Sequence, residues 1–208
     1  MLDAGACAEL DRRIVDDLAT EGWTCAPDFF ARSLWTPLAA EARAAVAEGQ
    51  LRLAAVGSGA QRRLAEQTRS DETLWLDPQQ ATPAQAAVLE RFDRLRIACN
   101  RELQLGLFEF EGHFAHYAKG RFYRRHRDQL AASDARVLSC VVYLNSDWHE
   151  HDGGQLRLYL DEDGGPRYVD VTPAGGTLVC FFSARFWHEV LDAQRDRLSL
   201  TGWLRRRT

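Results

Sequence analysis

The sequence predicts a mainly β fold, a jelly roll buttressed by N-terminal helices. From Gly106 onward, apolar and polar residues alternate with period 2, as in strands that bury one face. Turns rich in glycine and proline separate these segments, including Asp152-Gly153-Gly154 and Pro173-Ala174-Gly175-Gly176. Short strands joined by such turns favour a closed double sheet. The predicted strands are residues 107–117, 123–127, 136–145, 155–160, 167–171, 177–183, 187–191 and 197–205.

The first half of the chain is predicted to be mainly helical. Residues 11–19 place their apolar side chains on one helical stripe. Thr36-Pro37 predicts the start of an alanine-rich helix that runs to about residue 48, with the proline near its first position. Thr82-Pro83 predicts another helix start. One buried face of that long helix would carry Val88, Phe92, Leu95, Cys99 and Leu103. Short strands are expected at 22–25 and 72–76, and a glycine-containing loop at 56–60.

Length and composition are typical of one globular domain. The chain has 208 residues, of which 46% are hydrophobic and 27% charged. We expect residues 1–105 to supply helical support and a substrate loop, and residues 106–208 to form the jelly-roll core. The 26 basic and 30 acidic residues leave a formal net charge of −4, which argues against a nucleic-acid partner. Five cysteines without a Cys-x-x-Cys pair disfavour structural zinc and a disulfide framework.

The chain carries no visible targeting signal. Its N-terminus lacks the basic and apolar regions of a signal peptide. No apolar run approaches the roughly 18 residues of a transmembrane helix. We therefore expect a cytoplasmic location and no membrane partner.

The first candidate for chemistry is His126-Arg127-Asp128. In a strand, residues i and i+2 point to the same face, so His126 and Asp128 can converge on one ion. Taken alone, the pair is more often a surface pair or a hydrogen-bonded histidine. The same letters begin the catalytic loop of protein kinases. That loop requires an asparagine five positions after the aspartate, where Ser133 stands here, so we exclude a kinase.

His188 turns this pair into a metal-site prediction. It follows an apolar strand and a turn, in Phe186-Trp187-His188-Glu189-Val190. Two histidines and one carboxylate form the facial triad of non-haem iron(II) oxygenases, which leaves open positions on the metal. We therefore predict that His126, Asp128 and His188 bind iron.

Arg197 follows nine positions later and is the candidate for binding an organic acid. Alternation places Arg197, Ser199, Thr201 and Trp203 on one strand face, and leucines on the other. A buried, unpaired guanidinium is unfavourable by several kcal/mol, and a ligand carboxylate would supply a partner of matching geometry. Tyr143 could donate to the same carboxylate, although it could instead be an aromatic core residue.

Together these residues resemble the prolyl hydroxylases of the hypoxia-inducible-factor type and their bacterial relatives. The resemblance runs from about Tyr117 to Trp203, with a weaker echo at Arg69-x-Asp71 and Trp75. The shared runs are His126-x-Asp128, Tyr143-Leu144-Asn145-x-Asp147-Trp148, Gly153-Gly154-x-Leu156-Arg157, Phe181-Phe182-Ser183, His188-Glu189-Val190 and Arg197 with Thr201 and Trp203.

The resemblance implies a double-stranded β-helix that uses iron(II), 2-oxoglutarate and dioxygen, with ascorbate as a reductant. It implies 4-hydroxylation of a prolyl residue in a protein, with elongation factor Tu as the first substrate to consider. The ligands of the iron would be His126, Asp128 and His188. The cosubstrate would be bound by Arg197, Tyr143, Tyr117 and Thr201. The substrate would be bound by Tyr123, Trp203, Asp71 and Arg136.

Some positions depart from the family pattern. Ser70 and Thr68 differ from the usual residues around Arg69, and the Lys119-Gly120-Arg121-Phe122 segment has fewer glycines than the family loop. Substrate choice is the property that these differences affect. An oxygenase acting on a small molecule or free amino acid, and a non-catalytic sensing module, remain alternatives. His149-Glu150-His151 also resembles a metal site, but we expect it to face solvent in a loop.

Overall fold

The computed structural model describes residues 4–54, 67–128 and 135–207. The expected loop at 56–60 lies outside these residues. Within these ranges there are three α-helices, α1 (Ala4–Thr20), α2 (Arg32–Ala47) and α3 (Pro83–Leu103). The strands are β1 (Trp23–Ala26), β2 (Arg52–Leu53), β3 (Glu72–Trp75), β4 (Leu107–Tyr117), β5 (Tyr123–His126), β6 (Arg136–Tyr143), β7 (Leu156–Tyr159), β8 (Tyr168–Val171), β9 (Leu178–Phe182), β10 (His188–Val190) and β11 (Arg197–Arg206).

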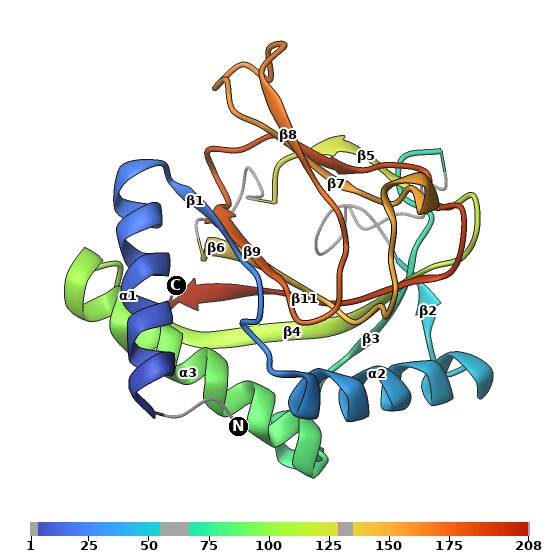
Figure 1. Cartoon of the computed structure of the whole chain (residues 1–208), viewed down its shortest axis with the longest axis horizontal. Helices are drawn as coiled ribbons and strands as arrows, with labels where there is room; N and C mark the ends of the chain where they lie inside the picture. The colour runs from blue at the N-terminus through green and yellow to red at the C-terminus, as the bar shows by residue number, and fades with distance from the viewer. Residues whose placement is uncertain (1–3, 55–66, 129–134, 208) are drawn as a thin grey trace.

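Two antiparallel sheets form the jelly roll. The larger sheet has the order β1-β9-β6-β11-β4-β3-β2, and the smaller has the order β5-β10-β7-β8. In Figure 1 the helices lie against one side of the long strands β4 and β11, whereas β5, β7 and β8 lie on the other side. All eight predicted strands from residue 107 onward are present, and the predicted mainly β jelly roll is confirmed.

The predicted helices are present, but one of them begins at a different residue from the one predicted. Thr82 caps α3, its hydroxyl accepting a hydrogen bond from the backbone N–H of Gln85, as the Thr82-Pro83 signal predicted. The expected start of α2 at Thr36-Pro37 was wrong, because the helix begins at Arg32 and Pro37 lies inside it. Trp35 packs against the core beside this turn, which favours helical structure before the proline. The two-residue strand β2 was not predicted.

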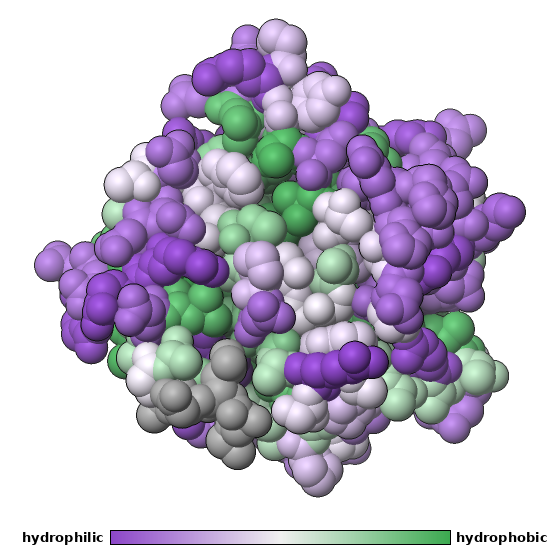
Figure 2. Space-filling model, in the orientation of Figure 1, coloured by the Kyte–Doolittle hydropathy of each residue, from purple (hydrophilic) through white to green (hydrophobic). Residues whose placement is uncertain are grey.

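The two faces of the larger sheet carry different side chains. Leu198, Leu200 and Leu204 of β11 lie in a cluster with the buried faces of the helices. The alternate residues of β11 point between the sheets. In the space-filling view, hydrophilic side chains form most of the outline, and hydrophobic ones lie mainly in hollows between them (Figure 2). Among the described residues, no helix is both long enough and apolar enough to span a membrane.

Candidate metal and cosubstrate site

A narrow cavity lies between the two sheets. Its walls come from both sheets, so segments far apart in the sequence contribute to it. The side chains that line it are Arg69, His113, Ala115, Tyr117, Tyr123, His126, Asp128, Val141, Leu156, His188, Val190, Arg197, Thr201 and Trp203.

The predicted iron ligands meet in this cavity. Strand pairing places His188 of β10 directly opposite His126 of β5. Asp128 follows β5, and its two carboxylate oxygens each lie 3.6 Å from an Nε2 atom, one of His126 and one of His188. The three ligand atoms all lie within 4.8 Å of one another. Such a cluster can surround one ion with two nitrogens and one oxygen.

Neighbouring groups orient the ligands. The Nδ1 atom of His126 lies 2.8 Å from the carbonyl oxygen of Arg124, and that of His188 lies 3.2 Å from the carbonyl oxygen of Phe186. A carbonyl only accepts, so each Nδ1 carries the hydrogen and each Nε2 presents a lone pair to the cavity. The hydroxyl of Ser139 donates to Asp128 at 2.7 Å.

Electrostatics favour the metal-binding protonation states. Burial lowers the pKa of His188 to about 4, so its imidazole is neutral near pH 7. Burial alone would raise the pKa of Asp128, but His188, His126 and the Ser139 hydroxyl together hold that pKa well below its usual range. A neutral imidazole and an ionised carboxylate are the forms that coordinate a cation. The donor set therefore fits iron(II), which accepts two imidazoles and one carboxylate.

The cosubstrate end of the cavity is built around Arg197. Its side chain is 1% exposed, and its Nε donates to the carbonyl oxygen of Gly154 at 2.8 Å. Gly154 has φ +65°, and a Cβ there would lie 2.9 Å from the arginine Cδ, so this position favours glycine. The Arg197 Nη2 atom and the Tyr143 hydroxyl are buried without a hydrogen-bond partner among the described residues.

A carboxylate would satisfy both unpaired groups. The rings of Tyr117 and Tyr143 lie 4.9 and 5.2 Å from the Arg197 guanidinium, so this charge sits between two aromatic walls. A buried guanidinium without an anion is unfavourable, whereas a ligand carboxylate would accept from the guanidinium and from the phenol together. Thr201 also lines the cavity, and its hydroxyl lies 3.1 Å from that of Ser199. The site residues present thus fit 2-oxoglutarate.

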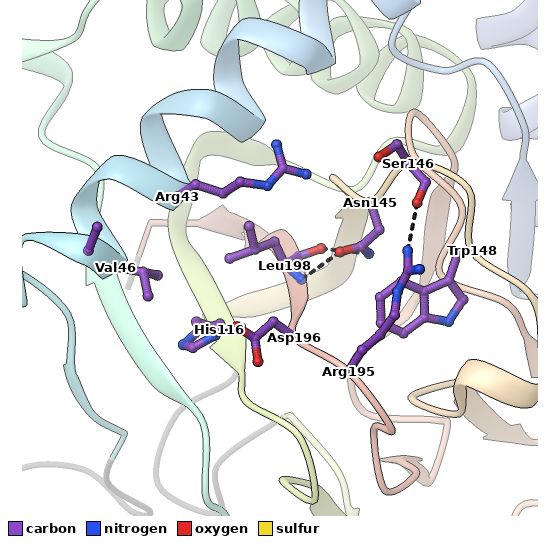
Figure 3. A pocket seen from close by; sticks show the side chains of 10 residues that line it. Arg43, Val46, His116, Asn145, Ser146, Trp148, Arg195, Asp196 and Leu198 are labelled. Carbon is purple, nitrogen blue, oxygen red and sulfur yellow. Dashed lines mark hydrogen bonds and ion pairs between the residues drawn. The ribbon is translucent and has the colours of Figure 1, made fainter.

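Asn145 holds the strand that carries Arg197. Its Oδ1 accepts from the backbone N–H of Leu198 at 2.7 Å, and its Nδ2 donates to the carbonyl oxygens of Leu198 and Pro173. Figure 3 shows the contacts between Asn145 and Leu198 at a second hollow, on the helix side of β11, where Arg43 and Val46 of α2 also lie. The amide thereby fixes the backbone next to the guanidinium from outside the cavity.

The predicted substrate residues lie at the other end, but not all of them face the cavity. The Tyr123 ring stacks on that of His126 with centroids 3.5 Å apart. Asp71 is fully buried, and its two oxygens accept from Arg69 at 2.6 and 2.8 Å. Arg69, whose guanidinium lies 4.6 Å over the Tyr123 ring, forms the cavity wall instead. The structure therefore places Asp71 as the support of Arg69 and not as a cavity-lining residue.

Trp203 and Arg136 form a pair beside the iron ligands. The Arg136 guanidinium lies 3.4 Å over the indole ring of Trp203, and 3.8 Å separates it from Glu111. The indole N–H of Trp203 is buried without a partner in the described part of the chain. Trp203 lines the cavity, whereas Arg136, predicted to bind the substrate, is not among the residues that line it and packs on the Trp203 ring instead.

Sequence reasoning missed His113 and undervalued Arg69. His113 is 1% exposed and lines the cavity. Alternation along β4 could have identified it, because His113 and Tyr117 are four residues apart and their side chains therefore point to the same face. His149 and His151 are exposed, as expected, with their rings stacked at 5.4 Å.

Comparisons with known proteins agree with this geometry. Residues 112–205 match the family model of the 2OG-Fe(II) oxygenase superfamily. A prolyl-4-hydroxylase from Pseudomonas putida is 47% identical in sequence, with a TM-score of 0.85 over 95% of this chain and 100% of that chain. This chain belongs to the prolyl hydroxylase family of 2OG-Fe(II) oxygenases.

Two animal relatives extend the comparison. A prolyl hydroxylase from Trichoplax adhaerens, solved with a peptide fragment of the hypoxia-inducible-factor oxygen degradation domain, is 26% identical with a TM-score of 0.83, over 96% of this chain and 90% of that chain. Human Egl nine homolog 1 is 29% identical over 143 residues, 65% of this chain. The chain matches only 32% of the length of that human protein. This oxygenase family uses iron(II), 2-oxoglutarate and dioxygen, and the three-ligand cluster and Arg197 fit the first two.

Proposed function

We propose that this protein is a prolyl 4-hydroxylase that acts on a proline within a protein substrate. The observation that carries the proposal is the cavity between the sheets, lined by three candidate metal ligands and by a buried arginine with a nitrogen that has no partner among the described residues. Bound iron would supply the activation of dioxygen coupled to decarboxylation of 2-oxoglutarate. Arg197 and Tyr143 would hold the distal carboxylate, and the two sheets would exclude water.

A protein substrate is favoured by the open end of the cavity and by the relatives. Trp75 is 48% exposed and stacks near Trp203, with ring centroids 6.2 Å apart, so an aromatic surface continues from the cavity to the outside. Aromatic surfaces of this kind suit proline-containing segments. The Trichoplax relative was solved with a bound peptide fragment. Elongation factor Tu is the first substrate to test, because bacterial members of the resembled family act on it.

The test is mass spectrometry of bacterial elongation factor Tu incubated with the enzyme, iron(II), 2-oxoglutarate and ascorbate. We expect one added oxygen on a proline, with stoichiometric succinate. The Asp128→Ala variant is the control and should give neither product. Oxidation of free proline, with no oxidised protein in a treated lysate, would contradict the proposal and favour a small-molecule oxygenase. Oxidation of lysate proteins other than elongation factor Tu would remove only that substrate.

A further inference from the structure

His113 is a buried polar side chain of the cavity wall that the proposed metal and cosubstrate sites do not use. It is 1% exposed, and neither ring nitrogen has a hydrogen-bond partner within the described residues. Most buried polar groups are paired, and each unpaired one is unfavourable by about 1–3 kcal/mol. Burial lowers the pKa of His113 to about 3, so the ring is neutral near pH 7, with one donor and one acceptor.

Strand register places this imidazole away from Arg197, which would bind the distal carboxylate of the cosubstrate. Tyr117 of β4 pairs with Arg197, whereas His113 pairs with Thr201, four residues along both strands. At about 3.4 Å per residue, this places the two pairs roughly 14 Å apart. A carboxylate bound at Arg197 would therefore lie beyond hydrogen-bonding reach of His113.

The surroundings of His113 indicate a peptide. Its ring lies 4.7 Å from that of Trp75 and 5.6 Å from that of Trp203. The indole N–H of Trp203 likewise has no partner among the described residues, and both side chains line the same cavity. Proline has no N–H, and a polypeptide at a proline presents carbonyl oxygens as its backbone polar groups. Aromatic rings can pack against the proline ring, and N–H groups without partners among the described residues can donate to the peptide carbonyl oxygens.

We propose that His113 is a substrate-binding residue, whose ring N–H donates a hydrogen bond to a backbone carbonyl of the polypeptide at the target proline. This inference rests on the proposed function. His113 lies on β4, between the strands that carry Trp75 and Trp203. The peptide would pack on the two indole rings, and the hydrogen bond to the imidazole would set how far the peptide enters the cavity. The same contact would discriminate against ligands that lack a carbonyl at this position.

The test uses three substitutions in the full chain. His113→Phe keeps a ring against the two tryptophans but removes both nitrogens. His113→Asn and His113→Gln each return a side-chain N–H, at different distances from the backbone. The probe is a library of peptides that each carry one proline, with oxidation followed by mass spectrometry. The best wild-type peptide then serves for kinetics on all variants.

For His113→Phe we expect kcat/KM for the peptide to fall roughly 5- to 150-fold, the range of one unpaired hydrogen-bonding group. The KM for 2-oxoglutarate should stay within about 2-fold of the wild-type value, because the cosubstrate end is untouched. At least one amide variant should recover part of the loss. Without peptide, His113→Phe should unfold at the same temperature as the wild type or higher, because an unpaired buried polar group is removed.

His116→Phe is the matched control. His116 lies on the same strand and is 7% exposed, but its side chain faces the second hollow, next to Asp196 (Figure 3). We expect this control to leave the peptide KM unchanged. The proposal is overturned if folded His113→Phe keeps the wild-type peptide kinetics, or if both phenylalanine variants lose the same amount. If the wild type itself oxidises no peptide and no protein, the result contradicts the proposed function and not only the role of His113.

Discussion

The two faces of β11 bury side chains of different chemistry. Toward the helices, Leu198, Leu200 and Leu204 are buried in a wholly apolar cluster. Toward the smaller sheet, Arg197 and Trp203 are also buried, but each has a polar atom without a partner among the residues described. One face stabilises the fold, and the other holds polar groups whose partners arrive with ligands. Unpaired polar groups are tolerated at binding sites because a well-packed neighbouring face offsets them.

The metal ligands give the largest expected effect on the cavity face. Asp128→Ala removes the carboxylate of the triad and should lower activity by more than about 100-fold, beyond the 10- to 100-fold typical of losing an outer partner of a metal ligand. Iron(II) binding, measured anaerobically by titration, should weaken in parallel. If this variant kept a tenth of the wild-type succinate formation, the metal assignment would be wrong.

On the helix face, Leu200→Ala should change stability and not binding. Leu200 is fully buried in the apolar cluster, so truncation should lower the free energy of unfolding by about 3 kcal/mol. Denaturant unfolding measures this loss. The KM for 2-oxoglutarate should remain near the wild-type value at a temperature where the variant is folded. A large rise in that KM would show that the two faces are not independent.

The opposite pattern is expected for Arg197→Leu. The KM for 2-oxoglutarate should rise roughly 100-fold, since a buried ion pair with the ligand is lost. The fold of the free protein should be kept, because a leucine replaces a charge that lacks an anion. Steady-state kinetics and thermal unfolding test both parts. Arg197→Lys, which keeps charge but not the planar fork, should give an intermediate KM.

The smallest effect concerns the support of the metal ligands. Ser139→Ala removes the hydrogen bond that Asp128 accepts and should weaken iron(II) binding about 10-fold. Ser183→Ala is the matched control, because its hydroxyl lies 2.8 Å from that of Ser139 and does not contact Asp128 directly. Ser183→Ala should weaken iron(II) binding less than Ser139→Ala does. Equal losses in both variants would show that Ser139 acts through packing and not through its hydrogen bond.

Much of the fold was predictable because its signal is local. Alternation in β4, β6 and β11 follows from one apolar face, and the predicted strands end within two residues of the observed ones. The start of α2 was not predictable from Thr36-Pro37, because packing of Trp35 against the core, a distant contact, favours helical structure before the proline. β2 pairs only Arg52 and Leu53 with β3, too short a run for periodicity.

The sequence predicted the metal ligands and the arginine of the site better than it predicted the other residues that line the cavity. His126, Asp128, His188 and Arg197 form a pattern of chemical types that few structural roles would produce. The sequence could not show whether Asp71 or Arg69 lines the cavity. Only the fold shows that the carboxylate is fully buried and that the arginine lines the cavity.

The sequence by itself determined the strands, the metal-ligand types and the inward phase of Arg197, since these depend on order and alternation along one chain. Only the tertiary structure decided that His188 pairs opposite His126, and that His113 lies buried with no hydrogen-bond partner in the part of the chain that the structure describes. The physical reason is that hydrogen bonding and burial depend on strand register between distant segments, and register is a property of the assembled sheets.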